Sequence, residues 1–218
     1  MPRPILRSYR LTEGGIDFTV VRKRVKNTTI RIKNGEVVVT APLYDSDAKT
    51  RSVVAKHAEW IRKHLSASEK TKGKVLLFGK LYDRVDETAP RASVSFENGI
   101  CIVRGKDGEK REKALLGFYK KAITPLLEPL FDKWQKTTGL YASKVAVTSA
   151  RSYLGRCEVN TRIIKISCRL AEKDISVIDY VVLHELCHIR HAGHQRDFYA
   201  LVAKYMPDYK ARIKLMKK

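Results

Sequence analysis

The sequence predicts an α+β protein, in which a mostly antiparallel β region (residues 1–105) precedes a helical domain with a small sheet (residues 106–218). Short runs with alternating apolar and polar residues, typical of half-buried strands, dominate the first region. Longer segments with apolar residues three or four positions apart, typical of helices, dominate the second. With 218 residues and 44% hydrophobic content, the chain can bury one large core or two smaller ones.

Strand patterns account for most of the first region. Alternation between residues 16 and 41 predicts several strands, and helical spacing follows over residues 45–65. Further strands are expected at residues 75–78, 81–85 and 92–103.

The second region begins with a long helical pattern over about residues 110–135. It contains Pro125 and Pro129, and because proline lacks an N–H group and clashes with the preceding turn, we expect a break or kink there. A strand is expected at residues 144–148 and another at residues 162–168. The latter could expose an edge to an extended peptide or be an ordinary core strand, because periodicity does not distinguish these alternatives.

Four of the six histidines fall in the segment HELCHIRHAGH, residues 184–194. Residues four apart on a helix lie on one face with Cβ atoms roughly 5–6 Å apart, so His184 and His188 can reach one cation. Glu185 lies beside this pair, where its carboxylate can take a proton from a water that the metal has acidified. This H-E-x-x-H pattern predicts one zinc ion per chain and hydrolytic chemistry.

A catalytic zinc ion usually takes three protein ligands, so a third is needed. On a continuous helix His191 would lie about 10 Å along the axis from His184, too far to share an ion. We therefore expect His194 to be the third ligand, after the helix ends and the chain folds back. Gly193 is expected to supply a left-handed residue for that ending, and Asp197 is a weaker candidate ligand.

The surroundings of the motif favour a buried helix from about residue 177 to about residue 190. Ser176 and Asp179 resemble a capping box at its start. The alternative, a chance motif among surface or core histidines, fits this context less well. The flanking apolar residues are Tyr180, Val181, Val182, Leu183, Leu186 and Ile189.

The segment from residue 151 to 198 resembles the YgjP-like family of metal-dependent hydrolases, which is related to the SprT and WLM metalloproteases. The likeness rests on a glycine–cysteine element, an extended segment, the helix V-I-D-Y-V-V-x-H-E-L-x-H, a third histidine and an aromatic position, here a phenylalanine. The resemblance implies a zincin-like metallopeptidase domain with His184, His188 and His194 as metal ligands and Glu185 as catalytic base. The spacing argument leads independently to the same residues.

The glycine–cysteine element departs from the family pattern. Where that pattern has R-W-G-S-C, this sequence reads YLGRC at residues 153–157, with leucine for tryptophan and arginine for serine. Substrate contacts of the family at this element therefore do not carry over. Polar side chains near the motif that could contact substrate are Arg151, Tyr153 and Tyr199.

The chain is strongly basic, with 44 Lys and Arg against 23 Asp and Glu and a net charge of +21. Because the charge is spread along the chain, we interpret the excess as a solvated surface, and non-specific nucleic-acid binding through that surface is the alternative. No RNP aromatic set or paired zinc finger accompanies it.

No stretch approaches the roughly 18 apolar residues of a membrane span, so no membrane partner is expected. The opening MPRP leads into no apolar segment of a secretory signal. The four cysteines form no C-x-x-C pair, which favours reduced thiols. We therefore expect a cytoplasmic protein.

The leading interpretation is a zinc metallopeptidase acting on a peptide or protein. A phosphohydrolase acting on nucleotides would suit the positive charge and Arg156, but phosphate chemistry more often uses Mg²⁺ held by carboxylates. A nucleic-acid-associated protein with a non-catalytic metal would need a fourth protein ligand, which the motif does not supply. Other divalent metals could replace zinc, because affinity alone does not select the metal.

Overall fold

A computed structural model describes residues 8–33 and 35–216 and confirms the α+β class. The chain divides into two compact units, Met1–Lys72 and Gly73–Lys218, which are described separately here. The opening residues that were considered for a secretory signal lie outside the described part. Within that part, no helix is long and apolar enough to cross a membrane.

The first unit is a four-stranded sheet with two helices. Its sheet has the order β1-β2-β4-β3, with antiparallel pairing at β1–β2 and β3–β4 and parallel pairing at β2–β4. Alternate residues of β2 and β4 are buried together with Val54 and Ile61 of the helices, so this unit has its own core. The elements are β1 (Ser8–Glu13), β2 (Ile16–Lys23), β3 (Thr29–Lys33), β4 (Glu36–Pro42), α1 (Asp47–Lys56) and α2 (Ala58–Thr71).

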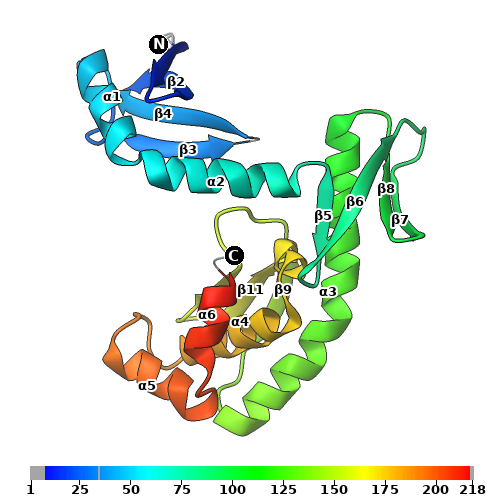
Figure 1. Ribbon diagram of the computed structural model, residues 1–218. Helices are drawn as coiled ribbons and strands as arrows, with labels where there is room; N and C mark the ends of the chain where they lie inside the picture. Colours follow the sequence, from blue (N-terminus) through cyan, green and yellow to red (C-terminus); the bar gives the residue numbers. More distant parts are fainter. Residues whose placement is uncertain (1–7, 34, 217–218) are drawn as a thin grey trace, which may run out of the picture. The chain divides into compact units, whose positions relative to one another are not determined.

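The second unit begins with a sheet that lies along the first half of the long helix α3 (Gly108–Thr138) (Figure 1). Val75 and Cys101 of this sheet share one core with Leu115 and Tyr119 of α3. The strands therefore group with the helices that follow them, whereas the sequence placed the division near residue 105. The strands are β5 (Lys74–Leu77), β6 (Lys80–Glu87), β7 (Ser93–Glu97) and β8 (Ile100–Arg104), in the order β5-β6-β8-β7.

Helix α3 runs through Pro125 and Pro129 without a break, and its axis changes direction part-way along (Figure 1), so of the two expected outcomes the structure shows a bend. Both prolines lie on the exposed face, where carbonyl groups left without an N–H partner can be solvated. The buried face continues past them through Ile123, Leu127 and Phe131. Packing of this apolar stripe outweighs the local cost of the prolines.

The rest of the second unit is a three-stranded sheet followed by helices. Strand β11 (Ile163–Ser167) is the middle strand of the order β10-β11-β9, so the core-strand alternative holds for it. Strand β10 (Gly155–Glu158) is an edge strand and is antiparallel to β11. The other elements are β9 (Lys144–Thr148), η1 (Cys168–Glu172), α4 (Ile175–Cys187), α5 (Arg196–Tyr205) and α6 (Tyr209–Met216).

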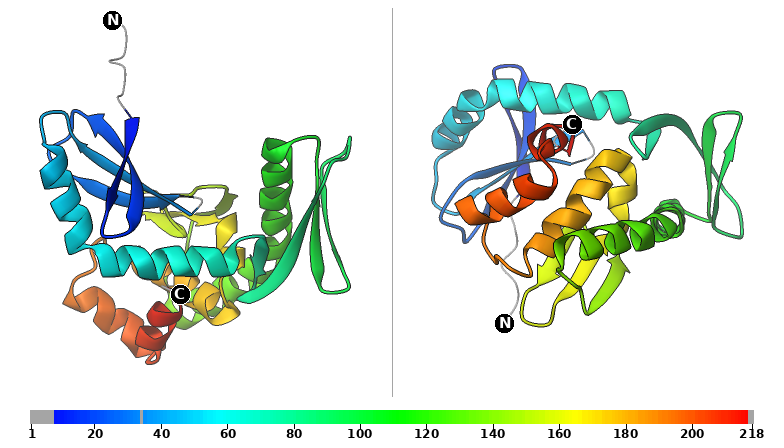
Figure 2. Two further views of the ribbon diagram at one scale, coloured as in Figure 1. Left: turned by 45° about the horizontal axis from the view of Figure 1, so that its top comes forward. Right: turned by 90° about the horizontal axis from the view of Figure 1, so that it is seen from below.

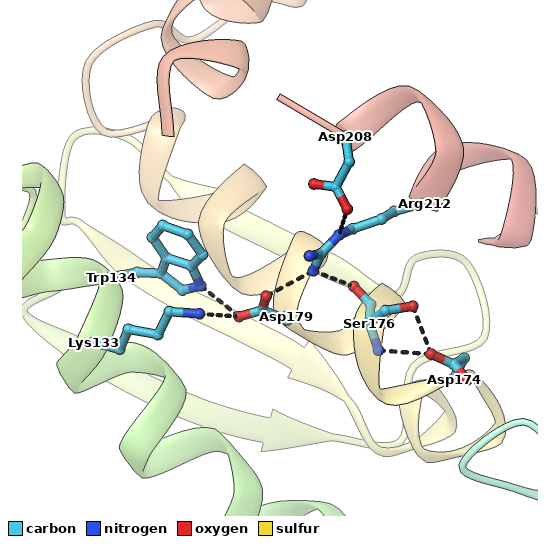
Figure 3. A network of polar contacts seen from close by, with 7 residues as sticks. All are labelled: Lys133, Trp134, Asp174, Ser176, Asp179, Asp208 and Arg212. Carbon is cyan, nitrogen blue, oxygen red and sulfur yellow. Dashed lines mark hydrogen bonds and ion pairs between the residues drawn. The ribbon is translucent and has the colours of Figure 1, made fainter. Parts of the chain in front are cut away.

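Helix α4 lies between α3 and α6 (Figure 2), and an aspartate joins the three. Asp179 accepts hydrogen bonds from the Trp134 indole and the Arg212 guanidinium, each at 2.7 Å (Figure 3).

Because the Asp179 carboxylate bonds to other helices, the capping box expected from Ser176 and Asp179 at the start of α4 is wrong. The N-cap is Asp174, which accepts a 2.8 Å hydrogen bond from the backbone N–H of Ser176.

Candidate metal centre

Three histidines converge at the end of α4. His184 lies in the last turn of the helix and His188 is its C-cap, with 3.2 Å between their Nε2 atoms. His194 comes from the loop before α5, and its Nε2 lies 3.0 Å from Nε2 of His184. In the described part of the chain, this is the one group of three or more potential ligands close enough to hold a metal ion.

Helix α4 ends at Cys187, and this ending allows the chain to fold back and bring His194 to the other two histidines. The His191 N–H donates to the Cys187 carbonyl at 3.0 Å, and Nδ1 of His188 donates to the His191 carbonyl at 3.0 Å. His191 thus contributes its backbone, and its side chain is not part of the cluster.

Gly193 does not adopt a left-handed conformation, so the expectation that it ends the helix in this way is wrong. Asp197 is exposed and lies beside Arg196.

A buried aromatic ring packs against the three imidazoles. Phe198 of α5 is fully buried, and its ring centroid lies 4.9, 4.5 and 5.0 Å from those of His184, His188 and His194. Since Phe198 offers no polar atom to the imidazoles, it fixes the rings by packing alone. This packing leaves the Nε2 atoms directed at one another, where they can share a ligand.

The surroundings favour neutral imidazoles. Burial, followed by the charges of the other two histidines, lowers the pKa of His184 to about 3. Burial also lowers the pKa of His188. A neutral imidazole has a nitrogen lone pair to offer, and a metal requires that form.

Glu185 lies against the edge strand β10. It is 5% exposed, and its carboxylate accepts a hydrogen bond from the backbone N–H of Cys157. Gly155 approaches so closely that a Cβ atom there would lie 2.5 Å from Oε1 of Glu185. Burial raises the pKa of Glu185 to about 7 and outweighs the opposing effect of the Cys157 N–H group.

His184 and Glu185 open into a hollow of about 440 Å³, which we call the α4 hollow. Its wall is largely apolar, and two arginines line it, the exposed Arg151 and the half-buried Arg169. Besides His184 and Glu185, residues that line it include Arg151, Tyr153, Leu154, Tyr180, Val181 and Met216.

The donor set fits a divalent metal ion. Three imidazole Nε2 atoms face one another at close range, and only a proton or a cation can make that arrangement favourable. Three nitrogen ligands with a position left for water are typical of catalytic zinc, which binds imidazole nitrogen at about 2.0–2.1 Å. The Nδ1 atoms of His184 and His188 have other partners, so Nε2 is the atom available to a metal.

Comparison with known proteins agrees with this geometry. Residues 26–218 match the family model described as YgjP-like, metallopeptidase domain. The chain belongs to this family.

This YgjP-like domain was also compared with solved structures and with curated proteins. The crystal structure of the metallopeptidase zymogen of Pyrococcus abyssi abylysin aligns with 39% of this chain and 87% of its own, at 19% identity and a TM-score of 0.37. That likeness is too weak to carry an argument about the site. No curated protein matches the sequence.

Of the three residues expected to contact substrate in this YgjP-like domain, two line the α4 hollow and one does not. Arg151 and Tyr153 line the α4 hollow beside His184 and Glu185. Tyr199 is not among the residues that line it, and its ring stacks on Tyr209 at a centroid distance of 5.8 Å.

Sequence reasoning missed two neighbours of the site. Tyr180 was assigned to the apolar flank, but its hydroxyl lies 3.0 Å from Nδ1 of His184. Its position four residues before His184 was the available signal, because such residues share a helix face. The contact of Gly155 with Glu185 left no signal, because it depends on which strand borders α4.

Proposed function

We propose that this YgjP-like protein is a zinc-dependent peptidase that uses His184, His188 and His194 as metal ligands and Glu185 as general base. The observation that carries the proposal is the convergence of three Nε2 atoms next to a buried carboxylate. Membership of a metallopeptidase family supports a peptide bond as the target. When bound, zinc lowers the pKa of a water molecule toward about 7 and polarises the substrate carbonyl.

The remaining chemistry belongs to Glu185. A carboxylate whose pKa lies near 7 can both take and return a proton at neutral pH. In this scheme Glu185 accepts the proton of the attacking water and passes it to the leaving amine. The Cys157 N–H group holds the carboxylate in place for both steps.

The α4 hollow is the proposed substrate site. Its wall includes Leu154, Val181 and Met216, which favour an apolar substrate side chain next to the bond that is cleaved. Arg151 and Tyr153 are proposed to contact the polar backbone of the peptide. Non-specific nucleic-acid binding through the basic surface stays a prediction.

Cleavage of a peptide library tests the proposal. The zinc-loaded protein and its Glu185→Gln variant are incubated with denatured peptides and, separately, with a nucleotide mixture, and products are identified by mass spectrometry. We expect peptide cuts that disappear in Glu185→Gln. Glu112→Gln is the control, because Glu112 pairs with Arg84 at 2.8 Å and does not line the α4 hollow.

Two outcomes would contradict the proposal. Peptide cuts that persist in Glu185→Gln would remove Glu185 from the mechanism. Glu185-dependent loss of nucleotides without peptide cleavage would favour the phosphohydrolase alternative.

A further inference from the structure

A tyrosine hydroxyl contacts Nδ1 of His184, the ring nitrogen that does not face the other two histidines. Tyr180 precedes His184 by one helical turn, and its hydroxyl oxygen lies 3.0 Å from Nδ1 of His184. Tyr180 is 2% exposed, and the two ring centroids are 5.4 Å apart. The contact is on the opposite side of the imidazole from Nε2, which faces the other two histidines.

The hydroxyl is the part of Tyr180 that packing does not explain. A buried polar group is costly unless it is hydrogen-bonded, and phenylalanine would fill nearly the same space without that requirement. Among the described residues, His184 is its one hydrogen-bond partner.

Nδ1 of His188 also has a hydrogen-bond partner. Its Nδ1–H group donates to the His191 carbonyl at 3.0 Å, so its Nε2 carries the lone pair. Hydrogen bonds of this kind orient metal-binding histidines and fix which ring nitrogen is protonated. Within the part of the chain that the structure describes, His184 has no carbonyl partner at Nδ1, and the Tyr180 oxygen occupies the corresponding position.

We propose that Tyr180 is a positioning residue for the metal centre. Its oxygen accepts the Nδ1 proton of His184, holds the ring at its angle and leaves the Nε2 lone pair directed at the metal. This inference rests on the proposed function, because it requires a metal at the three Nε2 atoms. Loss of such a partner typically weakens metal affinity 10- to 100-fold.

Zinc affinity tests the role of the hydroxyl. Zinc dissociation constants are measured by competition with a chromophoric chelator for the wild type, Tyr180→Phe and Tyr119→Phe. Tyr119 is the matched control, because it is 3% exposed and its hydroxyl donates to the Leu76 carbonyl at 2.8 Å. We expect about 10- to 100-fold weaker binding for Tyr180→Phe and unchanged binding for Tyr119→Phe.

A second measurement uses the wild type alone and does not depend on how the variant folds. Long-range ¹H–¹⁵N spectra of the zinc-loaded protein should show His184 protonated at Nδ1 and metal-bound at Nε2. Equal zinc affinity of the wild type and Tyr180→Phe, or metal at Nδ1, would overturn the role of Tyr180 and leave the proposed function standing. Absence of zinc binding by the wild type would overturn both.

Discussion

Gly155 leaves the space that the carboxylate of Glu185 occupies. A Cβ atom at residue 155 would lie 2.5 Å from Oε1 and 2.7 Å from Cγ of Glu185. No side chain fits there without displacing the glutamate, and the backbone N–H of Cys157, two residues along the same strand, holds that carboxylate. The edge strand β10 thus positions the proposed base through its backbone.

Gly155→Ala should therefore reduce activity without removing the metal. Displacing a general base removes a contribution of about 100- to 10,000-fold, so we expect kcat to fall by at least about 100-fold. Zinc affinity should stay within about threefold of the wild type, because Glu185 is not a ligand. The measurement is kcat and KM on a peptide found to be cleaved, together with zinc titration.

Gly117→Ala is the matched control for this prediction. Gly117 lies within α3, and a Cβ atom there would meet nothing within 4 Å. Its activity should equal that of the wild type. Full activity of Gly155→Ala would mean that Glu185 does not act from the position described.

Asp179 should stabilise the second unit, because it joins three helices (Figure 3). Asp179→Asn removes the charge that faces Arg212 and Lys133. We expect the free energy of unfolding to fall by about 1.5–3 kcal/mol, the range for hydrogen bonds to charged groups. Urea denaturation of the metal-free protein measures this change.

Asp208→Asn is the comparison, since Asp208 pairs with the same Arg212 at 2.9 Å but has a side chain that is 57% exposed. An exposed ion pair contributes about 0–1 kcal/mol. Equal losses in the two variants would show that burial of Asp179 has no special effect.

Sequence patterns predicted most of the second unit. The strand at residues 144–148 was found with its bounds, and the strands between residues 74 and 104 were found within a few residues, because alternation is local. The site helix was found because H-E-x-x-H places two histidines on one face. Contacts between distant segments, such as Gly155 with Glu185, depend on tertiary packing and leave no local pattern.

Two local rules depend on tertiary context. Pro125 and Pro129 do not break α3, because they lie on its exposed face while its apolar stripe stays packed, and the helix bends instead (Figure 1). Asp179 was assigned to a helix cap, but it bonds side chains of α3 and α6, and Asp174 takes the cap.

The cysteines should react slowly in the folded protein. All four are free, and burial raises the pKa of Cys101 and Cys168 and that of Cys157 to about 11. Because the thiolate is the reactive form, a higher pKa means less reaction at a given pH. At pH 8 Cys157 would be thiolate in about one molecule in a thousand, against about a quarter for a free thiol of pKa about 8.5.

Iodoacetamide labelling followed by mass spectrometry checks this prediction. Labelling of Cys157 should rise about tenfold per pH unit between pH 8 and 10 and should become fast at pH 8 in guanidinium chloride. Fast labelling of the native protein at pH 8 would contradict the raised pKa of Cys157, which is half-buried in β10.

The most direct test of the metal centre compares two histidines three residues apart. Zinc affinity and peptide cleavage are measured for the wild type, His194→Ala and His191→Ala. His191 supplies only its backbone carbonyl, which alanine retains, so His191→Ala should bind one zinc per chain with wild-type affinity. His194→Ala should bind at least about 100-fold more weakly, because a lost ligand costs more than a lost supporting hydrogen bond, and should not cleave peptides. Wild-type affinity in His194→Ala would contradict the three-histidine site.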